Sequence, residues 1–407
     1  MKLRYISEQR QLIKSFYVGI GKTAVIFPSA FLVAIGSGLM GLGMVFYMRD
    51  VLNASPSQIG LLAALWSFSY ILGCIFIRPL LDRLLPRYTL VIATFCMYLF
   101  TTLIHYVGSI ISVYVLYSLY GFSTSLFWPP LMGWFSRNIE GTELSKTISK
   151  FNLSWSIGLI ISPFLAGWLS EKTPRMPLYS GSGLFLLTGF MIIGAILVLP
   201  GIRKDRDTEL SSRVKNREKG KDTPIRYPAW VGLFTTYVVT GMILNIFPIS
   251  AREDLLLSKS VIGLLLLSRA LFTTSGFVIL GRTTFWHFKT LPMLLGQVFL
   301  MLLLIVMVYT PPPFLMGFIL GLMGLFIALG YSYSLFHGAS GSINRAKRMA
   351  IHESLLSAGL ISGASVGGML YERYSMATVY WFCSALVLIG VLLQAGFCLR
   401  AKRIKEK

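Results

Sequence analysis

Long apolar runs alternate along this chain with short polar segments that are rich in basic residues. A helix needs about 20 residues to cross an apolar layer of about 30 Å, and twelve of the runs reach that length. Six runs precede the polar stretch 202–227, and six follow it. The pattern predicts an all-α membrane protein with twelve transmembrane helices, at residues 24–47, 58–79, 88–108, 110–134, 151–169, 181–200, 229–251, 261–281, 290–309, 314–337, 351–370 and 378–399.

One stretch of the chain occurs twice. Residues 156–172 read SIGLIISPFLAGWLSEK and residues 357–373 read SAGLISGASVGGMLYER, with seven of the seventeen positions identical. Both copies end in an acid followed by a base, and the acids are Glu171 and Glu372. The separation of 201 residues is about half of the chain, whereas short-repeat proteins have units of about 20–50 residues. The repeat therefore indicates duplication of a whole half.

From this duplication we expect two pseudo-symmetric six-helix lobes, residues 1–200 and residues 229–407, joined by a charged cytoplasmic linker at 201–228. Duplicated halves of membrane proteins commonly meet around a central site near the middle of the bilayer. The first functional interpretation is therefore a transporter.

The composition, 55% hydrophobic and 13% charged with a mean hydropathy of +0.70, excludes a soluble globular protein. The net charge of +21 raises the question of nucleic-acid binding, but the basic residues lie in short clusters between apolar runs. With a cytoplasmic amino terminus, 30 of the 37 Lys and Arg residues lie on the cytoplasmic side, as the positive-inside rule requires. We expect a monomeric, multi-pass protein of the cell (inner) membrane, with both termini cytoplasmic and no nucleic-acid partner.

One cation, Arg269, belongs to neither side, because it lies near the middle of the eighth run. A charge at that depth costs about 2.5–3.5 kcal/mol and needs a polar cavity or a partner. No acid is expected at the same depth, so one interpretation is an anionic solute that binds the guanidinium through carboxylate or phosphate oxygens. The alternative is a structural role, in which backbone carbonyls and polar groups cap the guanidinium; the candidate caps are Asn245, Thr273 and Ser67.

Further candidate residues for solute contact lie near the same depth on other helices: Trp66, Trp128, Tyr237, Asn245 and Tyr331. Aligning the two halves at Gly60 and Gly263 places Trp66 opposite Arg269, so one lobe offers an aromatic face and the other a cation. Aromatic side chains also serve as packing in helix bundles, and this alternative stays open. The sequence FWPP at 127–130 additionally predicts a break in the fourth helix, because proline removes a helix hydrogen bond.

The segment 78–88, RPLLDRLLPRY, places Asp82, Arg83 and Arg87 in a tight turn between helices two and three. It resembles the signature loop of the major facilitator superfamily, G-x-x-x-D-R-x-G-R-[RK], with three of the signature positions replaced. The resemblance implies that Asp82 closes a cytoplasmic gate on the N-terminus of helix eleven, where Glu353 would meet Arg83 or Arg87. The alternative is that these charges only fix the topology.

The first copy of the repeat is similar to the helix-five motif of proton-coupled drug antiporters in the same superfamily, G-x-x-x-G-P-x-x-G-G. The motif implies either an antiport direction or close helix packing, because small residues four apart let helices approach each other. Its residues here are Gly158, Ser162, Pro163 and Gly167, with Gly363 and Gly367 in the second copy. A second antiporter motif, R-x-x-Q-G on helix four, is missing, since Tyr117 and Tyr120 replace its Arg and Gln.

The resemblance implies a secondary active transporter that moves a small organic solute, anionic or amphipathic, by alternating access between two lobes. One alternative is a proton-coupled multidrug efflux antiporter, and another, of a different class, is a non-transporting membrane sensor or scaffold on the same fold. Neither clustered acids nor a nucleophile dyad indicates an enzyme, and the chain lacks the G-x-x-x-x-G-K-[ST] loop of an ATPase. The expected partners are the solute, the lipid bilayer and a coupling ion or counter-substrate, with no cofactor and no metal.

Replacing Asp82 with asparagine should weaken closure of the cytoplasmic gate, because the N-terminus of helix eleven then loses its anion. Thiol-reagent accessibility of cysteines placed across this gate should rise in Asp82→Asn, and unchanged accessibility would count against the gate. If Glu353 pairs with Arg83 or Arg87, reversing the charges of both partners should restore the gate closure that either single reversal loses, and no rescue would reject the pairing.

Overall fold

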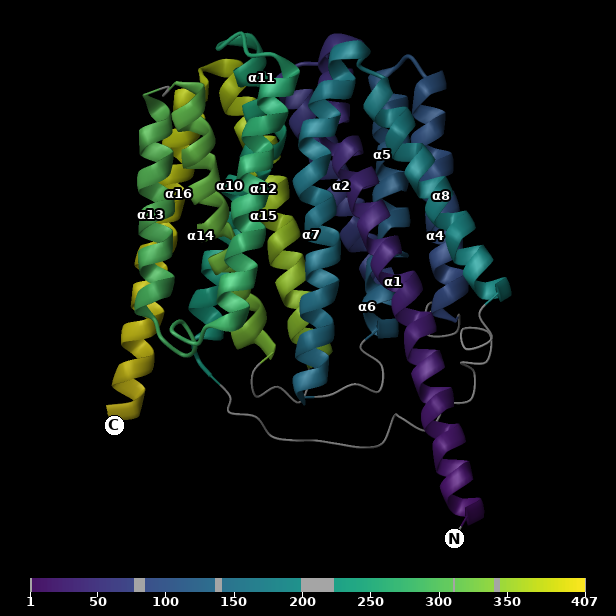
Figure 1. Ribbon diagram of the computed structural model, residues 1–407. Coiled ribbons are helices and arrows are strands. Elements are labelled where there is room, and N and C mark those ends of the chain that lie inside the picture. The colour runs from purple at the N-terminus through teal and green to yellow at the C-terminus, as the bar shows by residue number, and fades with distance from the viewer. Residues whose placement is uncertain are drawn as a thin grey trace.

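The computed structural model of the protein describes residues 2–76, 85–135, 141–198, 223–309, 312–339 and 345–406. Twelve spans in this part of the chain are long and apolar enough to cross a membrane, so the predicted number is confirmed. Both ends of the chain lie at one face of the bundle, which we call the terminus face, and α11 lies at the opposite face (Figure 1).

The bundle consists of helices that run from one face to the other. In the first lobe they are α1 (Lys2–Asp50), α2 (Pro56–Phe76), α4 (Pro86–Leu103) with the 3-10 turn η1 (Ile104–Tyr106), α5 (Ile110–Ser125), α6 (Trp128–Phe135), α7 (Gly141–Lys172) and α8 (Met176–Val198). In the second lobe they are α10 (Arg226–Asn245), α11 (Phe247–Glu253), α12 (Lys259–Arg282), α13 (Leu291–Val308), α14 (Pro313–Ala339), α15 (Arg345–Arg373) and α16 (Met376–Glu406). Most of the expected linker at 201–228 lies outside the described residues.

Two spans are broken. The fourth span divides between α5 and α6 at the predicted Phe-Trp-Pro-Pro sequence, since α5 ends at Ser125 and α6 begins at Trp128. The seventh span divides at Ile246, between α10 and α11, and the sequence analysis did not predict this break. Its cause is Pro248 in the first turn of α11, because proline has no N–H to continue the hydrogen bonds of α10.

The pseudo-symmetry of the lobes extends to their loops. Asn53, after the first span, and Leu256, after the seventh, are 203 residues apart and both have φ of 52°. In each loop the next residue donates its N–H to the carbonyl oxygen six residues earlier, at 2.9 Å in the first lobe and 3.0 Å in the second. A residue in the left-handed region follows the helix in each loop, as is common at helix C-termini. The two halves of the chain therefore make the same turn at the same place.

The lobes touch along two helix pairs, α2 with α15 and α7 with α12. The duplicated stretch supplies one helix of each pair. Four glycines lie where a Cβ would collide with a backbone carbonyl oxygen of the other lobe: Gly60 with Ala364, Gly263 with Pro163, Gly167 with Lys259, and Gly368 with Pro56. Because lipid tails are as apolar as leucine, helices in a membrane associate through such close packing and through hydrogen bonds. We call these two pairs the glycine crossings.

Two of the helices that begin at the opposite face, α2 and α12, start with the same capping pattern. Ser55 Oγ accepts a hydrogen bond from the Gln58 N–H, and Ser258 Oγ accepts one from the Val261 N–H, each at 3.3 Å. A helix leaves its first four N–H groups without partners, and a serine cap satisfies one of them.

A carboxylate from the other lobe satisfies another N–H of each helix. Glu372, near the end of α15, accepts hydrogen bonds from the Ser57 N–H at 3.0 Å and from the Ser55 hydroxyl at 2.9 Å. Glu171, near the end of α7, accepts one from the Ser260 N–H at 3.1 Å. We call Glu171 and Glu372 the capping carboxylates. Their negative charge also favours the positive end of each helix dipole, so the duplicated acids tie each lobe to the other.

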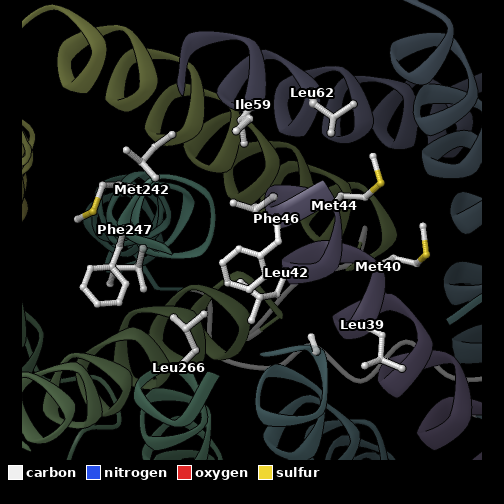
Figure 2. Close-up of a cluster of buried hydrophobic side chains, with 14 of the residues drawn as sticks. Leu39, Met40, Leu42, Met44, Phe46, Ile59, Leu62, Met242, Phe247 and Leu266 are labelled. Carbon is white, nitrogen blue, oxygen red and sulfur yellow. The ribbon is translucent and has the colours of Figure 1, made fainter. Parts of the chain in front are cut away.

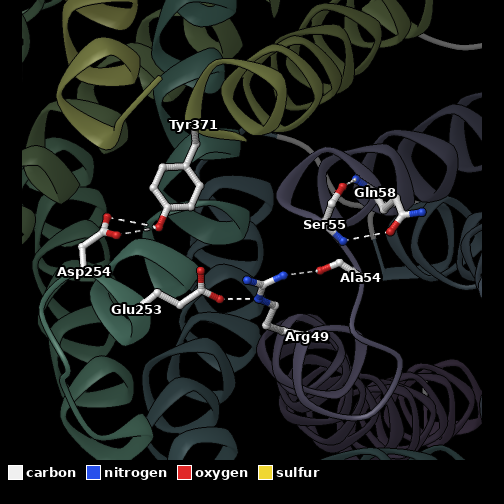
Figure 3. Close-up of polar contacts among 7 residues, drawn as sticks. All are labelled: Arg49, Ala54, Ser55, Gln58, Glu253, Asp254 and Tyr371. Atoms are coloured by element: carbon white, nitrogen blue, oxygen red, sulfur yellow. Dashed lines mark hydrogen bonds and ion pairs between the residues drawn. The ribbon is translucent and has the colours of Figure 1, made fainter. Parts of the chain in front are cut away.

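Ion pairs add to the closure of this face. Arg49 of α1 pairs with Glu253 at the end of α11, beside the start of α2 (Figure 3). Asp50 pairs with Lys259, which is buried and also donates to the Ser170 carbonyl oxygen at 3.3 Å. A buried cation of this kind is stable only when it is paired and hydrogen-bonded. The conformation described here is therefore closed at the opposite face.

An apolar layer lies beneath these polar contacts. Figure 2 shows side chains of the first lobe gathered against side chains of the second lobe. The first lobe contributes Leu42, Phe46 and Ile59, and the second contributes Met242, Phe247 and Leu266. The layer separates the opposite face from the middle of the bundle.

Removing the capping carboxylates should open the opposite face. In Glu171→Gln or Glu372→Gln the anionic cap is lost, which costs about 1 kcal/mol, or about a fivefold change in the closed-to-open ratio; the double variant should change it by about 25-fold. Spin labels at Tyr106 and Tyr309, which are exposed and lie one in each lobe at this face, should report longer distances by pulsed electron resonance.

The control is Lys172→Gln, since Lys172 lies in the same turn as Glu171 but packs on Trp168 of its own helix, 4.0 Å from the ring centroid. All label pairs are placed in a background without the four native cysteines. A double variant with the wild-type distance distribution would show that the capping carboxylates do not hold this face closed.

Candidate solute-binding site

Arg269 lies near the middle of α12, in the span Lys259–Arg282. Its backbone is fixed by two contacts: its carbonyl oxygen accepts the Thr273 hydroxyl at 2.8 Å, and Gly324 of α14 packs directly against the same carbonyl. The guanidinium Nε is buried and has no hydrogen-bond partner. Among the described residues, no carboxylate forms an ion pair with it. The side chain is thus a charge inside the membrane span without a protein counter-ion.

The three polar residues that were candidate caps use their hydrogen bonds elsewhere. Ser67 donates to the Ala63 carbonyl at 3.0 Å, and Asn245 donates to the Gly241 carbonyl at 2.8 Å. Thr273 donates to the backbone oxygen of Arg269 rather than to a more distant acceptor. Each side chain bonds to its own helix, and all three of these bonds go to backbone carbonyls.

Two tyrosines of the second lobe connect Arg269 with Glu353. Tyr237 of α10 and Tyr331 of α14 have ring centroids 6.4 Å apart. The Tyr237 hydroxyl interacts electrostatically with Arg269 and also with Glu353 of α15. Tyr331 interacts with Glu353 and packs edge-on against His352, at 4.9 Å between centroids. Four helices of this lobe therefore bring Arg269, Tyr237, Tyr331 and Glu353 together.

The first lobe supplies an aromatic wall to the same cluster. Trp66 and Tyr70 of α2 stack with ring centroids 5.7 Å apart and planes 7° apart. Tyr70 interacts electrostatically with Glu353 and Tyr331, so the wall reaches across the lobe boundary. The Trp66 Nε1 is buried without a hydrogen-bond partner. Tyr120 lies behind Trp66, 6.2 Å away, and its hydroxyl donates to Ser37 Oγ at 3.2 Å.

The sequence analysis did not select Tyr70 or its neighbour Cys74, which interacts electrostatically with Tyr70 and Glu353. Helical spacing was the available signal, because Tyr70 is four residues after Trp66 and therefore lies on the same face of α2. We call Arg269, Tyr237, Tyr331, Glu353, Trp66 and Tyr70 the central cluster.

Two predicted contact residues have other neighbours. Trp128 packs edge-on against Phe127 and Phe151, with centroids 5.2 and 6.2 Å away. Asn245 ends α10 at the break before α11. The contacts of the described residues do not connect either one to the central cluster.

The predicted cytoplasmic gate is described only in part. Asp82 and Arg83 lie outside the described residues. Arg87, in the first turn of α4, is buried and lies over the Tyr88 ring at 5.0 Å. Glu353 lies with the tyrosines of the central cluster, so its pairing with Arg83 or Arg87 stays a prediction for a state that is closed at the terminus face.

The corresponding loop of the second lobe is held by aromatic and backbone contacts instead of charges. His337 Nδ1 bonds to the Tyr333 carbonyl at 2.9 Å, which requires a proton on Nδ1, and Nε2 accepts the Phe288 N–H at 3.1 Å. These two bonds hold the imidazole in one neutral tautomer. Trp286 Nε1 donates to the Leu280 carbonyl at 3.1 Å. The terminus-face loops of the two lobes therefore differ in chemistry.

The packing-motif residues lie at helix contacts. Gly158 lies against the backbone of α1, and Ser162 lies against Gly38 of the same helix. Pro163 and Gly167 meet α12 at a glycine crossing. In the second copy, Gly363 packs against the Val238 carbonyl of α10, and Gly367 contacts Ile246 at ordinary distance. Each copy of the repeat thus has one face on its own lobe and one on the other lobe.

Comparison with known proteins gives a family and a fold. A model of the Major Facilitator Superfamily matches residues 26–226. The chain is similar in structure to the nucleoside transporter NupG, with a TM-score of 0.70 and 13% identity over 93% of this chain and 98% of that chain. It is also similar to a bacterial homologue of the human lysosomal transporter Spinster, in an inward-facing and occupied conformation. For that structure the TM-score is 0.65 and the identity 14%, over 96% of this chain and 97% of the other.

No curated protein sequence matches the chain significantly. At the identities of the two solved structures, the likeness extends to the fold and not to the solute. The family match in the first half, the shared fold over nearly the whole chain and the twelve spans agree with one another. The protein is an integral, multi-pass transporter of the major facilitator superfamily and not an enzyme.

Proposed function

We propose that this transporter moves a small organic solute with an anionic group, which binds Arg269 in the central cluster. The observation that carries the proposal is the guanidinium of Arg269, which lies inside a membrane span with a buried, unpartnered Nε and, among the described residues, no ion pair to a carboxylate. A solute carboxylate or phosphate would supply two parallel hydrogen bonds and the missing counter-charge. The aromatic side chains around it suit an amphipathic body.

Alternating access follows from where the lobes meet. The glycine crossings, the capping carboxylates and the ion pairs close the opposite face in this conformation. Solute would then reach the central cluster from the terminus face, which we assign to the cytoplasm from the positive-inside rule. Rocking of the lobes would break the polar contacts at the opposite face and expose the same cluster there.

Removal of the guanidinium should abolish binding of anionic solutes. We expect Arg269→Ala to lose about 100-fold in affinity for a solute carboxylate, because two charge-assisted hydrogen bonds are lost. Arg269→Lys should be intermediate, since lysine keeps the charge but not the planar fork. The measurement is a thermal-shift screen of the detergent-purified protein with anionic metabolites and lipophilic cations, because ligand that binds only folded protein raises its stability.

The control is Arg282→Ala, which removes an exposed arginine from the end of the same helix. The melting temperature of Arg269→Ala without ligand shows whether Arg269 has a structural role instead of a binding role. Because no carboxylate among the described residues forms an ion pair with Arg269, Arg269→Ala should melt close to wild type. A variant that melts much lower, or that binds anions as well as wild type does, would remove Arg269 from the solute site.

A further inference from the structure

A second charge without a partner belongs to the central cluster. Glu353 lies in the span Ile351–Arg373, near its terminus-face end, and is half-buried. Among the described residues, no cation pairs with its carboxylate and no group donates a hydrogen bond to it. Its electrostatic neighbours are neutral groups on three other helices: Tyr70 and Cys74 on α2, Tyr237 on α10 and Tyr331 on α14.

Arg269 and Glu353 do not neutralise each other. They form no ion pair, although both lie in membrane spans where an unpaired charge is costly. Tyr237 interacts electrostatically with both the cation and the anion, and its ring is 6.4 Å from the ring of Tyr331, centroid to centroid. Each charge is fixed by a different helix, α12 for Arg269 and α15 for Glu353. The cluster thus presents a positive and a negative site on two different helices.

Aromatic rings belong to the same cluster as these two charges. The Trp66–Tyr70 stack belongs to the first lobe, and its Tyr70 interacts electrostatically with Glu353. Tyr237 and Tyr331 flank them in the second lobe, and Phe277 packs against Tyr331 with centroids 5.4 Å apart. These rings offer apolar faces and few charges, which suits an uncharged spacer between two charged groups.

We propose that the solute is a zwitterion with separated charges: its carboxylate or phosphate binds Arg269, its ammonium group binds Glu353, and an apolar spacer lies between the tyrosines. The inference rests on the proposed role of Arg269 and adds Glu353 to the same site. A solute with only a negative charge would leave the Glu353 carboxylate unpaired. A dianion would place like charges together at Glu353, which disfavours its binding.

The test uses solutes that differ only in charge. One set is 4-(aminomethyl)benzoate, with 4-methylbenzoate as the matched anion and 4-methylbenzylamine as the matched cation. A second set is a series of linear ω-amino acids, which varies the separation of the two charges. Dissociation constants are measured by calorimetry on the detergent-purified full chain for wild type, Arg269→Gln and Glu353→Gln.

In wild type, at least one zwitterion should bind about tenfold more tightly than its matched anion, which corresponds to one added charged contact. In Glu353→Gln this preference should vanish while anion binding remains. In Arg269→Gln both the zwitterion and the anion should be lost.

Other results separate the two proposals. If the anion binds wild type as tightly as every zwitterion, or if Glu353→Gln keeps the preference, the zwitterion proposal fails while Arg269 keeps its role. If Arg269→Gln binds anions normally, the proposed function fails as well. If no compound of either set binds wild type, the zwitterion proposal is rejected.

The native thiol of Cys74 can report on the bound solute, because Cys74 is one turn from Tyr70 on α2, interacts electrostatically with Glu353 and is partly exposed. In a protein that retains only Cys74, the zwitterion should slow maleimide labelling, and the matched anion should slow it less. The control retains only Cys96, on α4, which packs against α5 and α8. Equal protection of both cysteines would indicate a general conformational effect and would place the solute outside the cluster.

Discussion

Close approach of helix backbones at the two glycine crossings is the contact on which the rest of this structure depends. In a bilayer, apolar side chains gain little by leaving lipid for protein, so the lobes need packing and hydrogen bonds to hold together. Gly60 and Gly263 allow the backbones to touch, and the capping carboxylates then reach the N-termini of α2 and α12. A bulkier residue at Gly60 or Gly263 would separate the two helices of that crossing. The backbone contact and the hydrogen bond to the capping carboxylate would then be lost together.

The same crossings decide which side chains face the middle of the bundle. Beyond Gly60, α2 continues towards the terminus face with Trp66 and Tyr70, and beyond Gly263, α12 continues with Arg269. The helices are fixed at one end, so Trp66 and Arg269, each six residues beyond its crossing glycine, lie at a common depth. The central cluster is therefore a consequence of where the lobes touch, and a shift of the crossing would carry the cluster with it.

The side chains that we propose to bind the solute lie where the two halves differ. The halves share their loop turns, serine caps, crossing glycines and capping carboxylates, all of which serve the contact between lobes. At the matched positions 66 and 269, however, one half has a tryptophan and the other an arginine. The loops at the terminus face differ as well, with His337 and Trp286 holding the second one. Two similar lobes that carry different side chains at matched positions can bind an asymmetric solute in one orientation. Two identical sets of side chains would bind it equally well in either orientation.

The sequence by itself determined the membrane class, the twelve spans, the duplication and the break at the fourth span, because length, hydropathy and proline act locally along the chain. It also selected Arg269, since a charge inside an apolar run is unusual wherever the helix lies. The break at Ile246 also has a local cause, because Pro248 is visible in the sequence, although the sequence analysis did not predict it. Only the tertiary structure decided that Tyr70 joins the cluster, that Trp128 and Asn245 have other neighbours, and that Glu171 and Glu372 cap helices of the opposite lobe. These relations join residues that are up to 317 positions apart, and helical periodicity specifies the face of a helix but not the helix that packs against it.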